Sequence, residues 1–132
     1  IVVMAAAVGD YRVKNAAAQK IKREGARLLE LEPTEDILSE IVAHRRAGTL
    51  VVGFAAETEN LLANGRAKLE RKGVDAIVAN DVSSCERGFD SERNAGSFLT
   101  RDTMVEFPEM SKTEMAARIL DEVERLRTPV RG

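Results

Sequence analysis

The sequence contains no tryptophan, and aromatic residues make up only 4% of its 132 residues. A core built from this composition must consist of aliphatic side chains and alanine. Its single cysteine, Cys85, excludes an internal disulfide and is typical of a reducing compartment. No apolar run approaches the roughly 18 residues of a membrane span, and no signal peptide is recognisable. Together these absences predict a cytoplasmic protein.

The sequence also lacks a large excess of charge of one sign. The net charge is -2, which gives no overall attraction to nucleic acid or membrane, so an anion site must come from local clusters of basic side chains. Apolar residues make up 44% and charged residues 32%, as in ordinary globular domains. The chain opens inside an apolar run without an initiator methionine. We therefore expect a single partial domain over residues 1–132, with an upstream segment missing.

Apolar runs of strand length alternate with segments of helical period. Runs at 1–8, 50–56 and 75–80 are typical of strands buried on both faces, and 34–48 and 59–72 have the spacing of helices. This alternation indicates right-handed crossovers and a parallel sheet. Residues 11–25 are interpreted as a long loop and 28–31 as a short strand.

The last third of the chain has a different pattern. Residues 97–100 and 104–107 flank a turn and predict an antiparallel hairpin. Ser111 and Glu114 form a capping-box signature ahead of a helix. The apolar stripe of this helix comprises Met115, Ala116, Ile119, Leu120, Val123 and Leu126. The prediction is an α/β fold: a three-layer, Rossmann-like, mostly parallel sheet with a C-terminal β-hairpin and helix.

Ligands of open α/β sheets bind outside the carboxyl ends of the strands, which here selects residues 9–23, 54–60 and 80–94. The common motifs are absent: there is no GxGxxG, no GxxxxGK[ST] and no cluster of cysteine and histidine for zinc. His44, beside two arginines near a predicted helix end, is interpreted as a surface residue rather than a member of a catalytic triad. Cys85 is interpreted as a loop thiol.

Two basic clusters fit an anionic ligand. Lys20, Lys22 and Arg23 lie in the first of these segments, and Lys68 and Lys72 share one helix face. A nucleoside triphosphate needs such point charges, although solvated surface is the alternative interpretation. Phe54 either packs against a base or belongs to the core. Asn80, at the end of the third strand, either lines the site or bonds its own backbone in a turn.

Eight short motifs follow one another in a distinctive order. They are residues 4–12 (MAAAVGDYR), 20–23 (KIKR), 35–38 (EDIL), 53–58 (GFAAET), 68–72 (KLERK), 79–82 (ANDV), 88–91 (GFDS) and 111–112 (SK). In this order and spacing the chain resembles the phosphopantothenoylcysteine synthetase family, the C-terminal part of a bifunctional decarboxylase/synthetase flavoprotein of coenzyme A biosynthesis. The chain departs from the family pattern at Gly9, Val13, Arg23 and Glu35, where the family has alanine, proline, lysine and proline.

The resemblance implies a CTP-dependent acid–amino-acid ligase. CTP activates 4′-phosphopantothenate as an acyl-cytidylate, and the amine of cysteine attacks it to give 4′-phosphopantothenoylcysteine and CMP. Mg²⁺ is expected on the phosphates, and FMN only in a fused decarboxylase half outside these residues. The resemblance also implies a homodimer, with 97–107 as a candidate contact. The isolated chain is expected to bind CTP weakly and to form no product.

The resemblance also implies the site. Lys20 is the catalytic candidate because its charge would stabilise acyl-cytidylate formation or breakdown. Asp10 would act on the ribose or through Mg²⁺, and these alternatives stay open. The implied CTP contacts are Ala6, Asp10, Lys20, Glu35, Asp36, Ile37, Leu38, Phe54, Lys68 and Lys72. A non-catalytic nucleotide-binding or dimerisation module of the same fold is the alternative function.

Overall fold

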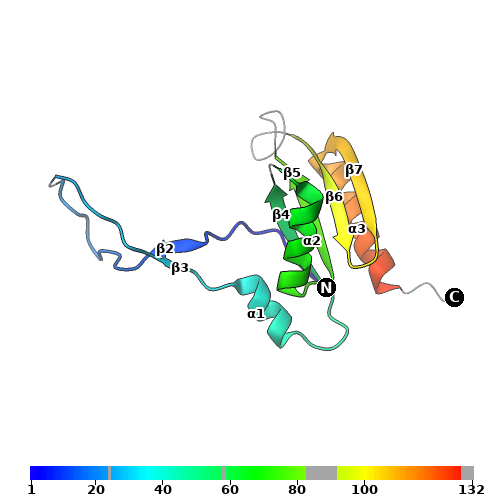
Figure 1. The fold of residues 1–132 in the computed structure, drawn as a ribbon, viewed down its shortest axis with the longest axis horizontal. Helices are drawn as coiled ribbons and strands as arrows, with labels where there is room; N and C mark the ends of the chain where they lie inside the picture. Colours follow the sequence, from blue (N-terminus) through cyan, green and yellow to red (C-terminus); the bar gives the residue numbers. More distant parts are fainter. Residues whose placement is uncertain (24, 58, 83–91, 129–132) are drawn as a thin grey trace. The chain divides into compact units, whose positions relative to one another are not determined.

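Five strands form one mixed sheet in the order β1-β4-β5-β6-β7 (Figure 1). The computed structural model describes residues 1–23, 25–57, 59–82 and 92–128. The strands β1 (Val2–Met4), β4 (Val51–Glu57) and β5 (Ala76–Asp81) run parallel, and β6 (Arg93–Thr100) and β7 (Met104–Ser111) continue the sheet as an antiparallel hairpin. The predicted fold class is confirmed.

Side chains alternate between the two faces of β4 and β5, and both faces are apolar. Val52 and Val78 pack against α3 (Lys112–Arg127), which contributes Met115, Ile119 and Val123 to that core. The opposite core contains Val51, Ala55, Ile77 and Leu99, together with Leu38 of α1 (Ile37–His44) and Leu69 of α2 (Leu61–Lys72). Burial of apolar side chains on both faces produces three layers.

Local signals end α2 and begin α3 as the sequence predicts. Gly73 adopts a left-handed conformation with φ 64°, and its N–H donates to the Leu69 carbonyl at 3.0 Å. At α3, the Glu114 N–H donates to the Ser111 hydroxyl, and the Ser111 N–H donates to the Glu114 carboxylate at 3.0 Å. No helix among these described segments is long and apolar enough to cross a bilayer.

The first strand differs from its prediction. Residues 1–8 were expected to form one strand buried on both faces, but β1 covers only Val2–Met4, and Val3 is exposed. The reason is its place at the edge of the described sheet, where it pairs with β4 alone.

Ala6–Ile37 form a second unit, separate from Ile1–Ala5 with Leu38–Gly132. The loop expected over 11–25 contains β2 (Tyr11–Val13), and the strand expected over 28–31 is replaced by β3 (Leu31–Pro33). The two strands are antiparallel, and ion pairs join them: Arg12 to Glu32 at 2.7 Å and Lys14 to Glu30 at 2.6 Å. Strands of three residues are too short to show periodicity in a sequence.

The bounds of α1 also differ from the prediction. Residues 34–48 were expected to be helical, but α1 is confined to Ile37–His44. The Thr34 hydroxyl does not cap this helix but donates to the Gly9 carbonyl at 2.5 Å, and Gly48 lies in a turn with φ 81°. On α3, Leu120 is 60% exposed, so the predicted apolar stripe is narrower there.

Candidate functional site

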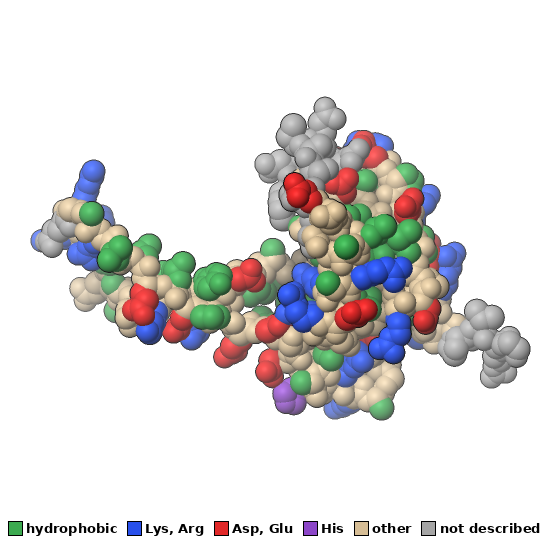
Figure 2. All heavy atoms as spheres, in the orientation of Figure 1, with side chains coloured by type: hydrophobic (Ala, Val, Ile, Leu, Met, Phe, Trp, Pro, Cys, Tyr) green, Lys and Arg blue, Asp and Glu red, His purple; other side chains and the backbone are tan. Residues whose placement is uncertain are grey.

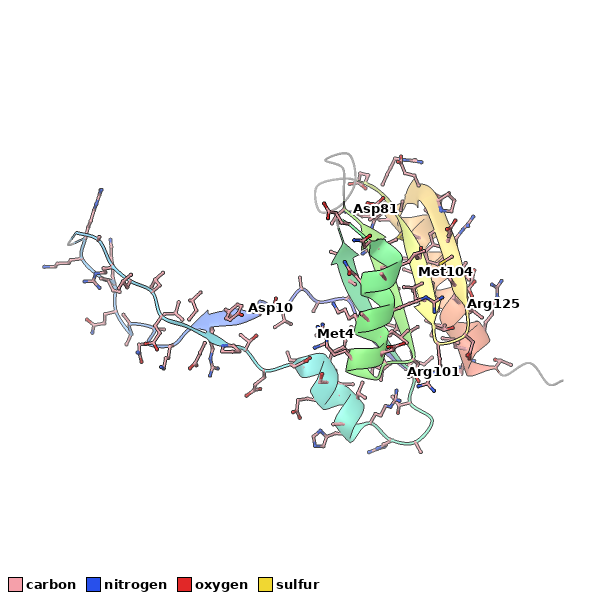
Figure 3. All side chains as sticks on the ribbon, in the orientation of Figure 1. Met4, Asp10, Asp81, Arg101, Met104 and Arg125 are labelled. Carbon is pink, nitrogen blue, oxygen red and sulfur yellow. The ribbon has the colours of Figure 1, made fainter. Side chains whose placement is uncertain are left out.

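The carboxyl ends of β4 and β5 lie in register at one edge of the sheet. Ala56 pairs with Asn80, and Glu57 pairs with Asp81, which Figure 3 shows at the end of β5. Two of the three segments selected from the sequence therefore begin side by side. This edge is where parallel α/β sheets bind ligands.

A lysine from α2 reaches the main chain of β4 at this edge. The Lys68 ammonium donates to the Phe54 carbonyl at 2.7 Å. Along a strand, every second carbonyl points toward the same neighbouring strand. Directly before β4, the Leu50 carbonyl points toward β1 and accepts from the Val2 N–H. The Phe54 carbonyl points the same way, but β1 ends at Met4, opposite Gly53. Lys68 therefore supplies a donor beyond the last strand residue of β1.

Lys68 and Lys72 lie one turn apart on α2, and both are half-buried. Their ammonium groups and the end of β4 belong to the same unit of the structure. Lys68 brings one cation to the main chain of β4, and Lys72 follows it by one turn toward the start of β5. Two cations on one helix face can neutralise an anion, which is the chemistry predicted for this pair.

Phe54 lies on the α3 face of the sheet, half-buried against the core that contains Val52, Val78 and Phe98. Both interpretations of this side chain keep a basis in the structure, because part of the ring packs in the core and part is accessible. Leu38 differs, since it is buried and its side chain packs where a Cβ on Gly53 would lie, 2.9 Å from Cδ2. A nucleotide contact at Leu38 would therefore involve its main chain.

The other predicted site residues belong to the second unit, and all of them are exposed: Ala6, Asp10, Lys20, Glu35, Asp36 and Ile37. Within that unit the Thr34 N–H donates to the Asp10 carbonyl at 2.9 Å, which leaves the Asp10 carboxylate outside this contact. Figure 3 labels Asp10 beside the β2–β3 ribbon. The CTP contacts of these residues stay a prediction.

The described segments do not build a metal site. No group of three or more histidine, cysteine, aspartate or glutamate side chains among them could hold an ion. The predicted Mg²⁺ and the role of Asp10 toward it stay a prediction. Cys85 lies outside the described residues. His44 is exposed, and its Nδ1 lies 3.0 Å from the Glu40 carbonyl at the end of α1, a local surface contact as predicted.

Asn80, for which the sequence left two interpretations open, lies at this edge at the end of β5. Asn80 Oδ1 is buried and accepts no hydrogen bond from any residue that the structure describes. The sequence signal was only an asparagine at the end of a strand. A second asparagine, Asn60, precedes α2 in a left-handed conformation with φ 49°, which the sequence did not indicate.

The layered, mostly parallel sheet defines an α/β protein of the Rossmann-like type. A profile of the DNA/pantothenate metabolism flavoprotein C-terminal domain matches residues 1–126. The chain therefore belongs to this family, and the resemblance indicated by the motifs is confirmed.

Similar proteins place the chain in the C-terminal part of longer ones. The coenzyme A biosynthesis bifunctional protein CoaBC of Thermococcus kodakarensis is 42% identical over 130 residues, covering 96% of this chain and 31% of that protein. A cysteine/cysteine sulfinic acid decarboxylase from an unidentified prokaryote is 35% identical over 125 residues, 93% of this chain and 35% of that protein. The chain thus spans about a third of these curated relatives.

A solved structure has the same fold. The C-terminal domain of a coenzyme A biosynthesis bifunctional protein CoaBC superimposes with a TM-score of 0.70 at 32% identity. The match covers 96% of this chain and 55% of the solved one. The fold and the family are therefore supported by sequence and by structure independently.

Proposed function

We propose that the chain is the nucleotide-binding part of a CTP-dependent ligase of coenzyme A biosynthesis. The ligase joins 4′-phosphopantothenate to cysteine through an acyl-cytidylate. The observation that carries the proposal is the family match over residues 1–126, together with relatives named for coenzyme A biosynthesis. The half-buried cations Lys68 and Lys72 on one face of α2 support it, because a triphosphate needs such charges.

In this proposal each basic residue has a role set by its charge. Lys68 and Lys72 hold the triphosphate from α2, and Lys20 stabilises the charge that develops as the acyl-cytidylate forms or breaks down. Asp10 binds the ribose or the cation. Mg²⁺ bound to the phosphates would supply charge neutralisation as pyrophosphate leaves. Holding both substrates together also removes much of the entropic cost of the reaction.

The parent protein is proposed to be larger than this chain. Because the relatives are about three times as long, we expect an upstream half, as in the bifunctional proteins, with a decarboxylase that uses FMN. A homodimer is also proposed. Large apolar side chains of the second unit stay exposed, among them Tyr11, Ile21, Leu28, Leu29 and Leu31. Figure 2 shows apolar side chains along this unit. Such a surface supports a contact with a second copy.

Calorimetric titration of the full-length gene product with CTP and with ATP tests the nucleotide. We expect CTP to bind more tightly, and Lys20→Ala to weaken CTP binding by about tenfold or more because a charge-assisted contact is lost. Arg27→Ala is the control, since Arg27 is an exposed cation of the same unit outside both basic clusters, and this variant should bind CTP like the parent. Equal binding of CTP and ATP would contradict the proposal.

Catalysis is tested separately with 4′-phosphopantothenate, cysteine and CTP, by mass detection of the amide and of CMP. The alternative function, a non-catalytic nucleotide-binding or dimerisation module, predicts CTP binding without product in the full-length protein. Product that depends on CTP rules out this alternative.

A further inference from the structure

The inference begins with the unpartnered oxygen of Asn80. The Oδ1 atom is buried, and no described residue donates to it. A buried polar atom without a partner destabilises the fold, so native proteins rarely keep one without a use. The atom lies at the carboxyl end of β5, inside the edge where the ligand is proposed to bind. An acceptor placed there can take an N–H or O–H from a ligand.

The residues paired with Asn80 on the neighbouring strands are small. Asn80 pairs with Ala56 on β4 and with Gly96 on β6, so its partners carry only a methyl group and a hydrogen. A Cβ at Gly96 would overlap the Ala79 carbonyl oxygen, which requires glycine at this position. The register shift between Asn94 and Gly96 places this glycine at a bulge. Bulges of this kind are frequent beside binding sites.

An aromatic ring lies on the same face of the sheet. Phe54 pairs with Val78, two residues before Asn80, so Phe54 and Asn80 are diagonal neighbours on adjacent strands. Both project from the α3 side, as Val52 and Val78 do. An aromatic face beside a carboxamide is a common way to bind a nucleobase, because the ring stacks on the base and the amide bonds its edge.

We propose that Asn80 is a specificity-determining residue that accepts a hydrogen bond from the exocyclic amino group of the pyrimidine base. This inference rests on the proposed CTP-dependent function. Cytosine presents an N4 amino donor, which satisfies the buried Oδ1. Uracil presents a carbonyl oxygen at the same position, so two acceptors would face each other. Sites built around such a bond reject the analogue that lacks it, because the buried group stays unpaired.

The test compares CTP and UTP binding to the full-length protein and to Asn80→Ala by calorimetry. The parent is expected to prefer CTP by about tenfold or more, the range of one base-edge contact. In Asn80→Ala this preference should disappear, mainly through weaker binding of CTP. Without nucleotide, the variant should melt within about 2 °C of the parent or above it, because it loses an unpaired buried group.

Asn94→Ala is the matched control. Asn94 is also buried, but its Oδ1 accepts from the Ala95 N–H at 3.0 Å. This variant should be less stable than the parent and keep its preference for CTP. If Asn80→Ala also lowers the melting temperature and keeps the preference, Asn80 is structural and the inference is wrong.

A ligand-side change tests the same bond without relying on the fold of a variant. The triphosphate of the pyrimidin-2-one riboside lacks the 4-amino group, and the parent should bind it as weakly as Asn80→Ala binds CTP. The two changes should not be additive if they remove one bond. Additive losses, or an analogue that the parent binds as tightly as CTP, overturn this inference and leave the proposed function standing. A parent that does not bind CTP overturns the proposed function as well.

Discussion

Gly65 sets how closely α2 can approach the sheet. A Cβ at this position would overlap Leu99 Cδ1, and Leu99 is fully buried. The same helix carries Lys68 and Lys72, so the close approach at Gly65 also positions these cations over the strands. Glycine in the middle of a helix is unfavourable by about 1 kcal/mol relative to alanine. The packing against Leu99 is the physical reason to have glycine there.

The substitution Gly65→Ala is expected to destabilise the protein. Overpacking a core costs about 1–3 kcal/mol, and the higher helix propensity of alanine returns about 1 kcal/mol. We therefore expect a net loss of up to about 2 kcal/mol in the free energy of unfolding, measured by urea denaturation. Arg66→Ala, on the exposed side of α2, is the control and should change stability little. A more stable Gly65→Ala protein would contradict this account.

Single residues of the site were predictable to different degrees. Lysines at helical spacing already indicated that Lys68 and Lys72 share a face. The sequence could not show that Lys68 donates to the Phe54 carbonyl, because that acceptor is free only where β1 ends. Asn80 was left between two interpretations, and its Oδ1 lacks the hydrogen bond from the described residues that a turn would give it.

At the scale of elements, the capping box at the start of α3 contains a titratable group, the Glu114 carboxyl. The hydrogen bonds from the Ser111 hydroxyl and from the Ser111 N–H lower the pKa of the Glu114 carboxyl below its usual value. A carboxyl group with a lower pKa in the folded state stabilises the protein above its unfolded pKa. That contribution is lost as the pH falls through the folded value.

Glu114→Gln is therefore expected to be less stable than the parent at neutral pH. The difference in the free energy of unfolding should shrink as the pH falls below the pKa of an ordinary glutamate carboxyl, about 4.3. Urea denaturation at a series of pH values measures it. Ser111→Ala removes the hydroxyl that bonds the same carboxylate but keeps the main-chain N–H donor, so its effect and that of Glu114→Gln should be only partly additive. A difference that stays constant from neutral to acidic pH would show that the carboxylate is not involved.

Elements with strong local signals were predicted well, and short ones were not. The runs that became β4 and β5, and the caps at Gly73 and Ser111, depend on nearby residues, so periodicity and capping rules locate them. The strands β2 and β3 depend on pairs some 20 residues apart in sequence, such as Arg12 and Glu32. Such pairings leave no periodic pattern within either segment.

At the scale of the whole molecule, the exposed apolar side chains of the second unit lead to a prediction about assembly. Leu28 and Leu29 are 101% and 74% exposed. Placing charges there, as Leu28→Asp with Leu29→Asp, should weaken a dimer that buries them, because each buried leucine contributes about 1.5–3 kcal/mol. Sedimentation of the full-length protein across concentrations measures the dimer constant. Leu120→Asp, on the exposed side of α3, is the control and should leave it unchanged.

The sequence by itself determined the family, the three layers, the parallel strands, the C-terminal hairpin, the end of α2 and the start of α3. These follow from hydrophobic period, capping residues and motif order, all of which are local in the chain. The tertiary structure decided the partner of Lys68, the short β1, the pairing of β2 with β3 and the unpaired oxygen of Asn80. Each of these depends on hydrogen-bonding groups and side-chain volumes that meet only after distant segments have packed together.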